Sequence, residues 1–595
     1  MKFLFLLFTF FFAHFLHCDA EYRLYTHFGA HPTAKGTKFT LFAPNAQSVS
    51  VLVHKNKKTK MRRLDSGIWE AEIAGVKEGS TYTYQIRTKQ GKKISKIDPF
   101  ACKMRPHKGK YQGIVHYVDK FQWTDAEWLE KRKKFTDKNC PISIYEVHIG
   151  SWEKKTSFKQ LAAKLGPYCK KLGFTHVEVF GLFATASKTG WGYRPLSFFA
   201  HTDALQGNFE EFVNEMHRME IGVIIDWIPG HFSTNFIGLE NFDGTPLYEY
   251  QDLRMAWGAR LFDYSKTHVQ NFLLSSAHFW LDQMHVDGIR VDSLDTMVQN
   301  ASNPQDVQKS MHTLNTCLKP QFPGVVTIAE SWDVPNTTSE QGFGFDYKWS
   351  GGTNRILKFL TMDFKKRHGN DARNKPLFNA ITEAMKGQNN EKLLWHTDHD
   401  KSRKETGSLY QQMPGTHFEK CAHVRLFIGY LLTLVGKKMI FMGDELAQKT
   451  DWDTRLQESA FGSSVEWECK NDPCHAGVQS MVESLNALYR SHTALHHENI
   501  LTVCHTDMNN HVICYRRDNL VFVCNFGRQG FDRYTTPLSV AARTMREIFT
   551  SDSISFGGSG KTNPVIELDR NVRKRAGSFT IQLPALSVLI FELEY

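Results

Sequence analysis

Past its first twenty residues, the sequence has no apolar run of the roughly 18 residues that a membrane span needs. It also lacks a strong charge of one sign, because 73 basic and 62 acidic residues leave only +11 over 595 positions. The densest basic stretch, "HKNKKTKMRR" (54–63), lies between two strand-like runs, and we interpret it as a solvated hairpin. The sequence therefore favours neither a membrane protein nor a nucleic-acid-binding protein.

A complete phosphate-binding loop is missing as well. The stretch "GGSGKT" (557–562) has the end of that motif, but Ser555 stands where a glycine is needed and no helical pattern follows. We predict a surface turn there.

Cysteines are few and scattered. Of the 11, Cys514 and Cys524 lie in strand-like apolar runs, which predicts core thiols. Only Cys469 and Cys474 are close enough in a loop to make a pairing worth testing. Removal of Cys18 with an N-terminal leader would leave an even number, which permits disulfides in an oxidising compartment.

That leader is predicted from residues 1–20, "MKFLFLLFTFFFAHFLHCDA". One lysine precedes a continuous apolar core, and Ala20 is small enough for cleavage, as in secretory signal peptides. We therefore expect a secreted or periplasmic protein with no membrane attachment after cleavage. An uncleaved anchor is the alternative.

The rest of the chain divides into three parts. Residues 21–115 alternate apolar and polar positions between Gly, Asn and Pro, which predicts a β-sandwich. In residues 116–490, short apolar runs alternate with amphipathic helices that begin at capping pairs such as Ser157 with Gln160 and Asn208 with Glu211. About eight such units favour an α/β fold, a (β/α)₈ TIM barrel, over an open sheet. Residues 491–595 return to short strands, a C-terminal all-β domain.

Acidic residues stand at the ends of the barrel's apolar runs: Asp226 ends "GVIID", Asp292 ends "GIRVD", Glu330 ends "VTIAE" and Asp400 ends "LLWHTDHD". The carboxyl ends of parallel barrel strands meet at one face, where such enzymes keep their active sites. One such acid is as often a helix cap as a functional group, but four together predict a site.

The residue types suggest glycosidic bond chemistry. Arg290 lies two residues before Asp292 on one strand, so both side chains point the same way and the guanidinium favours the ionised carboxylate. Glu330 follows an apolar run that would keep it protonated as a general acid. One ionised and one protonated carboxyl group are what glycosidases use. His231 and His399 are candidate donors to sugar hydroxyls, and Trp191 and Tyr193 offer stacking faces.

These motifs resemble the conserved regions of glycoside hydrolase family 13, the α-amylase family. They are "DWIPGH" (226–231), "GIRVDS" (288–293), "TIAES" (327–331) and the histidine-aspartate pair at 399–400. "ISIYEVHIGSW", "FDGTPLYEY", "MPG", "GKKMIFMGDE" and, near the N-terminus, "GAHP" narrow the resemblance to the 1,4-α-glucan (glycogen) branching enzymes. The resemblance covers nearly all of the expected mature chain.

It implies a retaining mechanism on α-glucan, with Asp292 as the nucleophile, Glu330 as the acid/base and Asp400 as the third carboxylate. Sugar-binding residues would be Trp191, Tyr193, Asp226, His231, Arg290 and His399. It also implies a carbohydrate-binding-like module of family 48 at the N-terminus, and neither a metal nor another cofactor.

The sequence departs from the branching-enzyme pattern at several points. Only 37 residues separate Asp292 from Glu330, and Arg194, Ser331 and Lys401 stand where relatives carry other residues. Three functions therefore stay open: a branching transglycosylase, a secreted α-glucan hydrolase, and a non-catalytic glucan-binding protein.

Asp398 is an anomaly beside the expected third carboxylate, because relatives place a small or amide side chain there. If the strand ran straight on, Asp398 and Asp400 would face the same way. We predict that Asp398→Ser is tolerated and that Asp400→Asn abolishes turnover.

Overall fold

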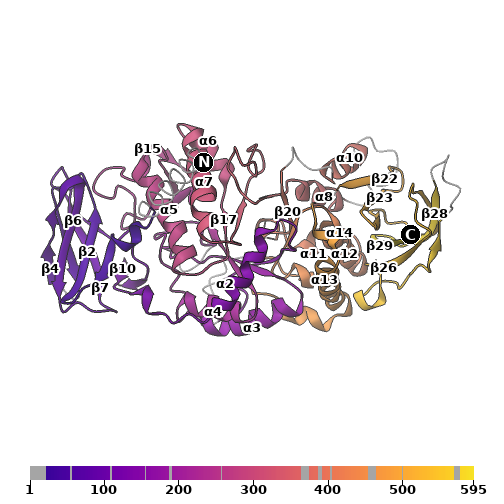
Figure 1. Cartoon of the computed structure of the whole chain (residues 1–595), viewed down its shortest axis with the longest axis horizontal. Coiled ribbons are helices and arrows are strands. Elements are labelled where there is room, and N and C mark those ends of the chain that lie inside the picture. Colours follow the sequence, from indigo (N-terminus) through magenta and orange to yellow (C-terminus); the bar gives the residue numbers. More distant parts are fainter. Residues whose placement is uncertain are drawn as a thin grey trace, which may run out of the picture.

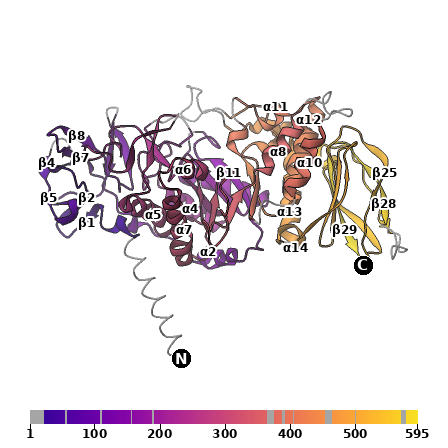
Figure 2. The ribbon, with the colours of Figure 1, turned by 90° about the horizontal axis from the view of Figure 1, so that it is seen from above.

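The computed structural model describes residues 22–53, 57–107, 110–154, 156–186, 191–255, 257–362, 374–385, 391–402, 405–452, 464–498, 500–568 and 577–595. The predicted signal peptide, residues 1–20, lies outside them. Three units follow one another along the longest axis of the molecule: N-terminal β-sheets, a central barrel and C-terminal β-sheets (Figures 1 and 2).

The N-terminal unit is the predicted β-sandwich. One sheet has the order β1-β2-β6-β5 and the other β4-β3-β7-β10-β9, with β8 on β7. Within the described part of the basic stretch, residues 57–60 form β4 antiparallel to β3, and residues 62–63 form β5 antiparallel to β6. The strands are β1 (Gly29–Pro32), β2 (Gly36–Phe42), β3 (Ser48–Val53), β4 (Lys57–Lys60), β5 (Arg62–Arg63), β6 (Ile68–Ala74), β7 (Thr81–Arg87), β8 (Lys93–Lys96), β9 (Met104–His107) and β10 (Lys110–Ile114).

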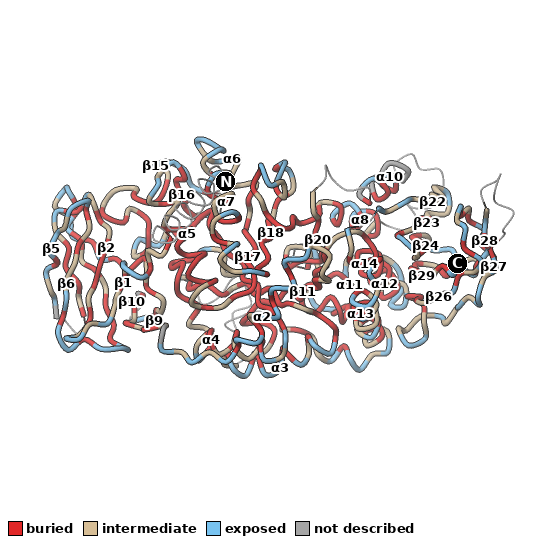
Figure 3. Tube along the Cα trace, in the orientation of Figure 1, coloured by how far each residue is buried: buried red, intermediate tan, exposed pale blue. Residues whose placement is uncertain are grey.

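The central unit is the predicted barrel, closed by eight parallel strands. The four acid-ended apolar runs form β13, β17, β18 and β20, and β19 has only three residues with a lysine in the middle, too short and too polar for a run to show in the sequence. The strands are β11 (Ser143–His148), β12 (His176–Phe180), β13 (Gly222–Trp227), β17 (Gly288–Val291), β18 (Val326–Ala329), β19 (Tyr347–Trp349), β20 (Leu393–His396) and β21 (Lys437–Phe441). Buried residues concentrate in these strands (Figure 3).

Helices connect the barrel strands. Ser157 caps α3 as predicted, because its Oγ accepts the backbone N–H of Gln160 and the Gln160 side chain accepts that of Ser157. The described helices are α2 (Ala126–Arg132), α3 (Phe158–Lys171), α4 (Phe209–Arg218), α5 (Thr267–Asp282), α6 (Leu294–Asn300), α7 (Pro304–Thr313), α8 (Gly352–Leu360), α10 (Asn374–Met385), α11 (Leu409–Gln412), α12 (His417–Thr433), α13 (Pro473–Ser491) and α14 (Thr493–His496). No helix in the described ranges is both long and apolar enough to cross a membrane.

A small antiparallel sheet of order β14-β16-β15 follows β13 in the chain and is separate from the barrel sheet. Its strands are β14 (His231–Ser233), β15 (Glu249–Arg254) and β16 (Ala259–Phe262).

The C-terminal unit is all-β, as predicted, with one sheet of order β22-β23-β24-β29-β26-β27 and a second of β25 and β28. Residues 557–565 form a loop without a helix, in agreement with the predicted turn. The strands are β22 (Leu501–Asp507), β23 (Val512–Arg517), β24 (Leu520–Asn525), β25 (Phe531–Pro537), β26 (Thr544–Thr550), β27 (Ile566–Glu567), β28 (Ser578–Leu583) and β29 (Ser587–Glu594).

Buried cations join both β units to the barrel. Lys96 of β8 donates to the backbone carbonyls of Phe236, Gly238 and Glu240. Arg517 of β23 donates to the carbonyls of Thr433 and Leu434 at 2.9 and 3.0 Å. Both side chains donate to backbone carbonyls of the barrel unit, so the interfaces depend on specific polar contacts as well as apolar packing.

Candidate active site

The predicted site residues gather at the carboxyl ends of β13, β17, β18 and β20. Asp226 lies in β13 directly opposite Arg290 of β17 in the parallel register. Asp292 and Glu330 are the first residues after β17 and β18. Asp400 lies in a 3-10 turn, His399–Lys401, shortly after β20. The barrel therefore brings together side chains that lie up to 174 positions apart, counted from Asp226 to Asp400.

Arg290 holds three of these carboxylates. Its Nη1 donates to Oδ1 of Asp226 at 2.5 Å and to Oδ1 of Asp292 at 2.9 Å, and its Nη2 lies 2.9 Å from Oε2 of Glu330. The guanidinium also lies over the Trp349 ring, 4.4 Å from its centroid. One buried cation thus fixes the relative positions of three acids.

Solvent access distinguishes these acids. The side chains of Asp292 and Glu330 are 10% and 13% exposed, whereas that of Asp226 is 2% exposed. A ligand entering from the open face reaches Asp292 and Glu330 first. Asp226 is placed to orient Arg290 and its neighbours.

The ionisation of Asp292 is more finely balanced than the sequence suggested. Burial and the charges of Glu330 and Asp226 raise the pKa of Asp292 well above its usual value, while Arg290 lowers it. Our expectation that the arginine alone would keep this pKa low was wrong, because it underestimated desolvation and the crowding of acids. Arg290, together with His399, favours the ionised form of Asp292 against burial and the neighbouring acids.

Glu330 is oriented by the backbone of the neighbouring strand end. Ser293 adopts a left-handed conformation, with a φ of 50°, that side-chain-bearing residues rarely take. This conformation directs the Ser293 N–H to Oε2 of Glu330 at 2.7 Å. The strained turn after Asp292 thus positions the second carboxyl group of the pair.

A second hydrogen-bonded chain runs through the expected sugar-binding residues. The Tyr193 hydroxyl donates to Oδ2 of Asp226 at 2.6 Å and lies 3.0 Å from Nε2 of His399. The Tyr193 and His399 rings stack with centroids 5.4 Å apart. His231 donates from Nε2 to the backbone carbonyl of Tyr193 at 2.7 Å. Burial lowers the pKa of His231 to about 4, so it is a neutral donor.

Trp191 and Asp400 complete the predicted set. The Trp191 ring contacts the His399 ring edge-on, with centroids 5.4 Å apart, and packs on the Trp452 ring, with centroids 4.8 Å apart. Asp400 is half-buried, and its charge contributes to raising the pKa of His399. All nine predicted residues therefore belong to one region, and their individual roles stay predictions.

Two buried acids of the site were missed. Glu146 of β11 and Glu178 of β12 lie side by side in the barrel register, each enclosed by protein. Glu146 accepts from Nδ1 of His399 at 2.6 Å and from its backbone N–H at 3.1 Å. Although burial opposes the charged imidazole, Glu146 raises the pKa of His399 to about 10. Burial and the nearby Glu146 raise the pKa of Glu178 well above its usual value. The sequence did carry a signal for these two residues, because each is an acid inside an otherwise apolar run, "YEVHIG" for Glu146 and "HVEVF" for Glu178.

Asp398 does not share the direction of Asp400. The strand ends at His396, and the following turn separates the two aspartates. Asp398 is fully buried, with its Oδ2 2.9 Å from Nδ1 of His396 and its Oδ1 3.8 Å from Nζ of Lys401. That serine is tolerated here in turnover stays a prediction, while the contacts of Asp398 with His396 and Lys401 point to a role in stability.

Comparison with known proteins agrees with this architecture. Three family profiles match in order: carbohydrate-binding module 48 (isoamylase N-terminal domain) at residues 27–101, the alpha amylase catalytic domain at 249–496, and the alpha amylase C-terminal all-beta domain at 503–594. The chain is 34% identical to "1,4-alpha-glucan branching enzyme GlgB" of Protochlamydia amoebophila, over 96% of this chain and 84% of that protein. It is 32% identical to the GlgB enzyme of Oceanobacillus iheyensis, over 94% and 93%. The chain belongs to the 1,4-α-glucan branching enzyme family.

Solved structures support the fold of this branching-enzyme family member. The pullulanase from Bacillus acidopullulyticus superposes with a TM-score of 0.73 at 17% identity, over 95% of this chain and 74% of that one. A pullulanase from Anoxybacillus, in complex with maltotetraose, gives 0.73 at 15%, over 97% and 89%. At these identities the likeness shows the fold alone.

Two departures from the branching-enzyme pattern have defined partners in the structure. Ser331, next to Glu330, donates to Oδ1 of Asp295 at 2.8 Å, and Asp295 also accepts the backbone N–H of Trp332 at 2.6 Å. Lys401 pairs with Asp398 and lies over the Trp332 ring, 5.6 Å from its centroid. The changed residues are thus integrated into the loops that follow β18 and β20.

Proposed function

We propose that this chain is a 1,4-α-glucan branching enzyme, which cleaves an α-1,4 linkage and transfers the released chain to a 6-hydroxyl to form an α-1,6 branch. The arrangement that carries the proposal is the pair of accessible carboxyl groups, Asp292 and Glu330, held on the two ends of one buried guanidinium. The chain is similar over nearly its full length to proteins named as branching enzymes, and this similarity supports branching as the reaction that these two carboxyl groups catalyse.

In the first step, the Asp292 carboxylate attacks the anomeric carbon while Glu330 gives its proton to the glycosidic oxygen, so that the reducing-end part of the chain leaves. The donor chain remains as a glycosyl ester of Asp292. Retaining enzymes place these carboxyl groups about 5–5.5 Å apart, and the shared guanidinium favours such a short separation.

In the second step, ionised Glu330 removes the proton of an acceptor 6-hydroxyl, whose oxygen attacks the anomeric carbon and frees Asp292. Asp400, His399, His231 and Tyr193 would bind sugar hydroxyls and favour the distorted ring, with Trp191 stacking nearby. No dissociable cofactor takes part in this scheme. The partner is an α-glucan such as glycogen, starch or amylose, in keeping with the N-terminal match to a carbohydrate-binding module.

An assay on amylose tests the proposal. Branching lowers iodine colour and creates α-1,6 linkages, measured by NMR, without a matching rise in reducing ends. If reducing ends rise in proportion to the loss of colour, the enzyme is a hydrolase and the proposal is wrong. If the protein binds glucan but catalyses no reaction, the proposal is also wrong and the chain is a non-catalytic glucan-binding protein.

Asp292→Asn tests the nucleophile, with Asp532→Asn as the control. Asp532 is a carboxylate of the C-terminal unit whose side chain is 91% exposed. We expect the first variant to lose turnover by about 10³-fold or more and the second to keep it. Full activity of Asp292→Asn would refute the assignment.

We also propose that the protein is exported, on the strength of the charged, apolar and small-residue pattern of residues 1–20. Expression of the full chain in a secreting host should give a product that begins at Glu21, as measured by intact mass. A cell-retained product that keeps Met1 would contradict the proposal.

A further inference from the structure

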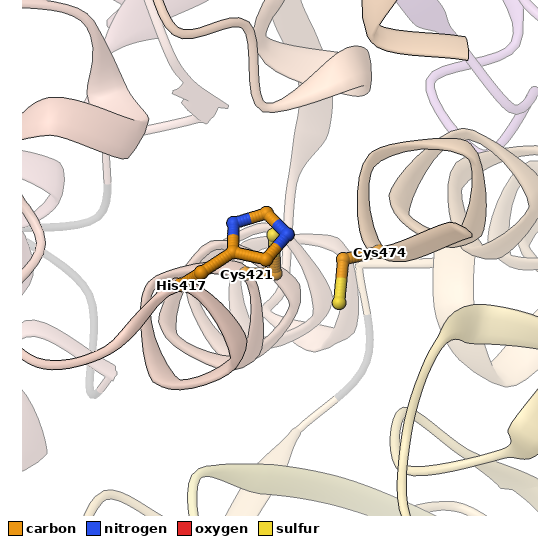
Figure 4. Close-up of side chains that lie close together, drawn as sticks. All are labelled: His417, Cys421 and Cys474. Carbon is orange, nitrogen blue, oxygen red and sulfur yellow. The ribbon is translucent and has the colours of Figure 1, made fainter. Parts of the chain in front are cut away.

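A cluster of metal-binding side chain types lies away from the sugar site, where the start of α12 meets the start of α13. His417 and Cys421 are one helical turn apart, on the same side of α12. Cys474 belongs to the first turn of α13, and its Sγ lies within 4.8 Å of the Sγ of Cys421. Figure 4 shows these three side chains gathered between the two helices. Two thiols and an imidazole at one helix junction are a donor set typical of zinc.

The donor atoms are nearly close enough to share an ion. Those of His417, Cys421 and Cys474 all lie within 4.8 Å of one another, and so do those of His417, Asp472 and His475. Zinc bonds of about 2.0–2.3 Å place tetrahedral ligands about 3.3–3.8 Å apart. The two groups share His417, so bringing both cysteines and His475 onto one ion requires side-chain movement at this helix junction.

His475 supplies an independent sign of a missing ligand. The residue is buried, and its Nδ1 lies 2.9 Å from the backbone carbonyl of Leu446. A carbonyl can only accept, so the proton is on Nδ1 and the lone pair is on Nε2. Nε2 is buried and has no hydrogen-bond partner among the described residues. An imidazole held through one nitrogen by a carbonyl, with the other nitrogen available, is how metal-binding histidines are oriented.

Asp472 has a different task. It is the N-cap of α13, where its Oδ1 accepts the backbone N–H of Cys474 at 2.9 Å, and the same oxygen lies 3.2 Å from Nε2 of His417. It therefore fixes the first turn of α13 and orients His417, whose Nδ1 lies 2.9 Å from the Tyr410 hydroxyl, so a metal at His417 would replace one of these two contacts. His475, whose Nε2 makes no such contact, is the better fourth ligand.

We propose that His417, Cys421, Cys474 and His475 bind one zinc ion in a tetrahedral site closed to substrate. The sequence alone implied no metal. The ion would join α12, which follows the loop carrying His399 and Asp400, to α13, which follows the loop carrying Trp452. Trp452 packs on Trp191 at 4.8 Å, so the joined loops border the sugar site. The ion's task would be structural, since four protein ligands leave no open position.

The experiment uses the full chain, purified with its thiols reduced and counted, then freed of metal with a chelator. Titration with Zn²⁺ should saturate at one ion per chain. Co²⁺ in place of zinc should give the strong visible absorption of a tetrahedral site together with thiolate-to-metal charge transfer. Zinc should also raise the Tm, because it binds the folded state.

Variants separate this site from adventitious binding. Cys421→Ala with Cys474→Ala should abolish both the stoichiometric binding and the charge-transfer band. His475→Asn keeps a donor near the Leu446 carbonyl but lacks Nε2, and we expect its zinc affinity to fall about tenfold or more. Cys469→Ala, a nearby buried thiol outside the cluster, is the matched control and should bind as the wild type does.

Two results would overturn the proposal. One is reduced wild-type protein that binds zinc no tighter than the double alanine variant. The other is an isolated protein with a Cys421–Cys474 disulfide whose reduced form gives no charge-transfer band with Co²⁺. Neither readout uses branching activity, so the metal site and the reaction are tested separately.

Discussion

Two buried histidine-carboxylate pairs lie at the end of β20 and just beyond it, and the pKa values of their histidines are shifted in opposite directions. Nδ1 of His399 lies 2.6 Å from Glu146, and Nδ1 of His396 lies 2.9 Å from Asp398. The pKa of His399 is raised to about 10, whereas burial lowers the pKa of His396 below its usual value. Both rings are enclosed, so desolvation alone does not explain why they differ.

The surrounding charges explain it. Glu146 outweighs burial in raising the pKa of His399, and Asp400 adds to its effect, whereas burial outweighs Asp398 at His396, where Lys401 further opposes protonation. Lys401 also helps His396 to hold the pKa of Asp398 below its usual value against burial. In the His399–Glu146 pair, the raised pKa favours the imidazolium form of the ring. In the His396–Asp398 pair, Lys401 helps to stabilise the ionised aspartate.

Asp400→Asn should have the largest effect, on the side of His399. The variant keeps its shape but loses the charge that binds sugar hydroxyls and supports the imidazolium. We expect kcat on amylose to fall about 10³-fold or more with little change in Tm. Near-normal kcat would show that our motif register is wrong.

Asp398→Ser should have the opposite profile. The substitution removes a fully buried carboxylate flanked by His396 and Lys401, and losing its contacts should cost about 1–3 kcal/mol of unfolding free energy. Because the pKa of Asp398 is lowered on folding, this stability is present above the unfolded pKa near 3.9 and is lost as pH falls. Urea unfolding at pH 7 and at pH 3 should show a large and then a smaller deficit. Turnover per folded molecule should stay close to normal; a large loss would place Asp398 in the site.

The sequence located the acids at the strand ends better than the carboxylates of these two histidine pairs. Apolar runs that end in acids located Asp226, Asp292 and Glu330, because a parallel barrel converges its strand ends whatever the loops do. The direction of Asp398 depended on where β20 stops, which local pattern does not reveal. Glu146 and Glu178 were missed because a buried acid within a strand is stabilised by residues from other strands, and those neighbours are known only from the fold.

Glu146→Gln should have an intermediate effect. The amide still reaches His399 but removes the charge that keeps its pKa high, and burial then lowers it. In the wild type, stability from this pair is complete below the unfolded pKa near 6.5 and is lost as pH rises through about 10. We expect kcat/KM at pH 7 to fall about 10- to 100-fold, and its alkaline limb to move to lower pH. A lowered but unshifted pH profile would mean that Glu146 acts only by packing.

Lys401→Gln should have the smallest effect and is the most direct test of the comparison. The lysine side chain is 24% exposed and lies 3.8 Å from Asp398, so its loss should cost about 1 kcal/mol or less. Without the positive charge of Lys401, the pKa of His396 should rise, as followed by NMR of its ring protons. Lys133→Gln, which removes a surface partner of Glu130, is the control and should leave that pKa unchanged. If the pKa of His396 is the same in Lys401→Gln and Lys133→Gln, then burial and Asp398 set the charge state of His396. Lys401 would then contribute only to the stability of the ionised Asp398.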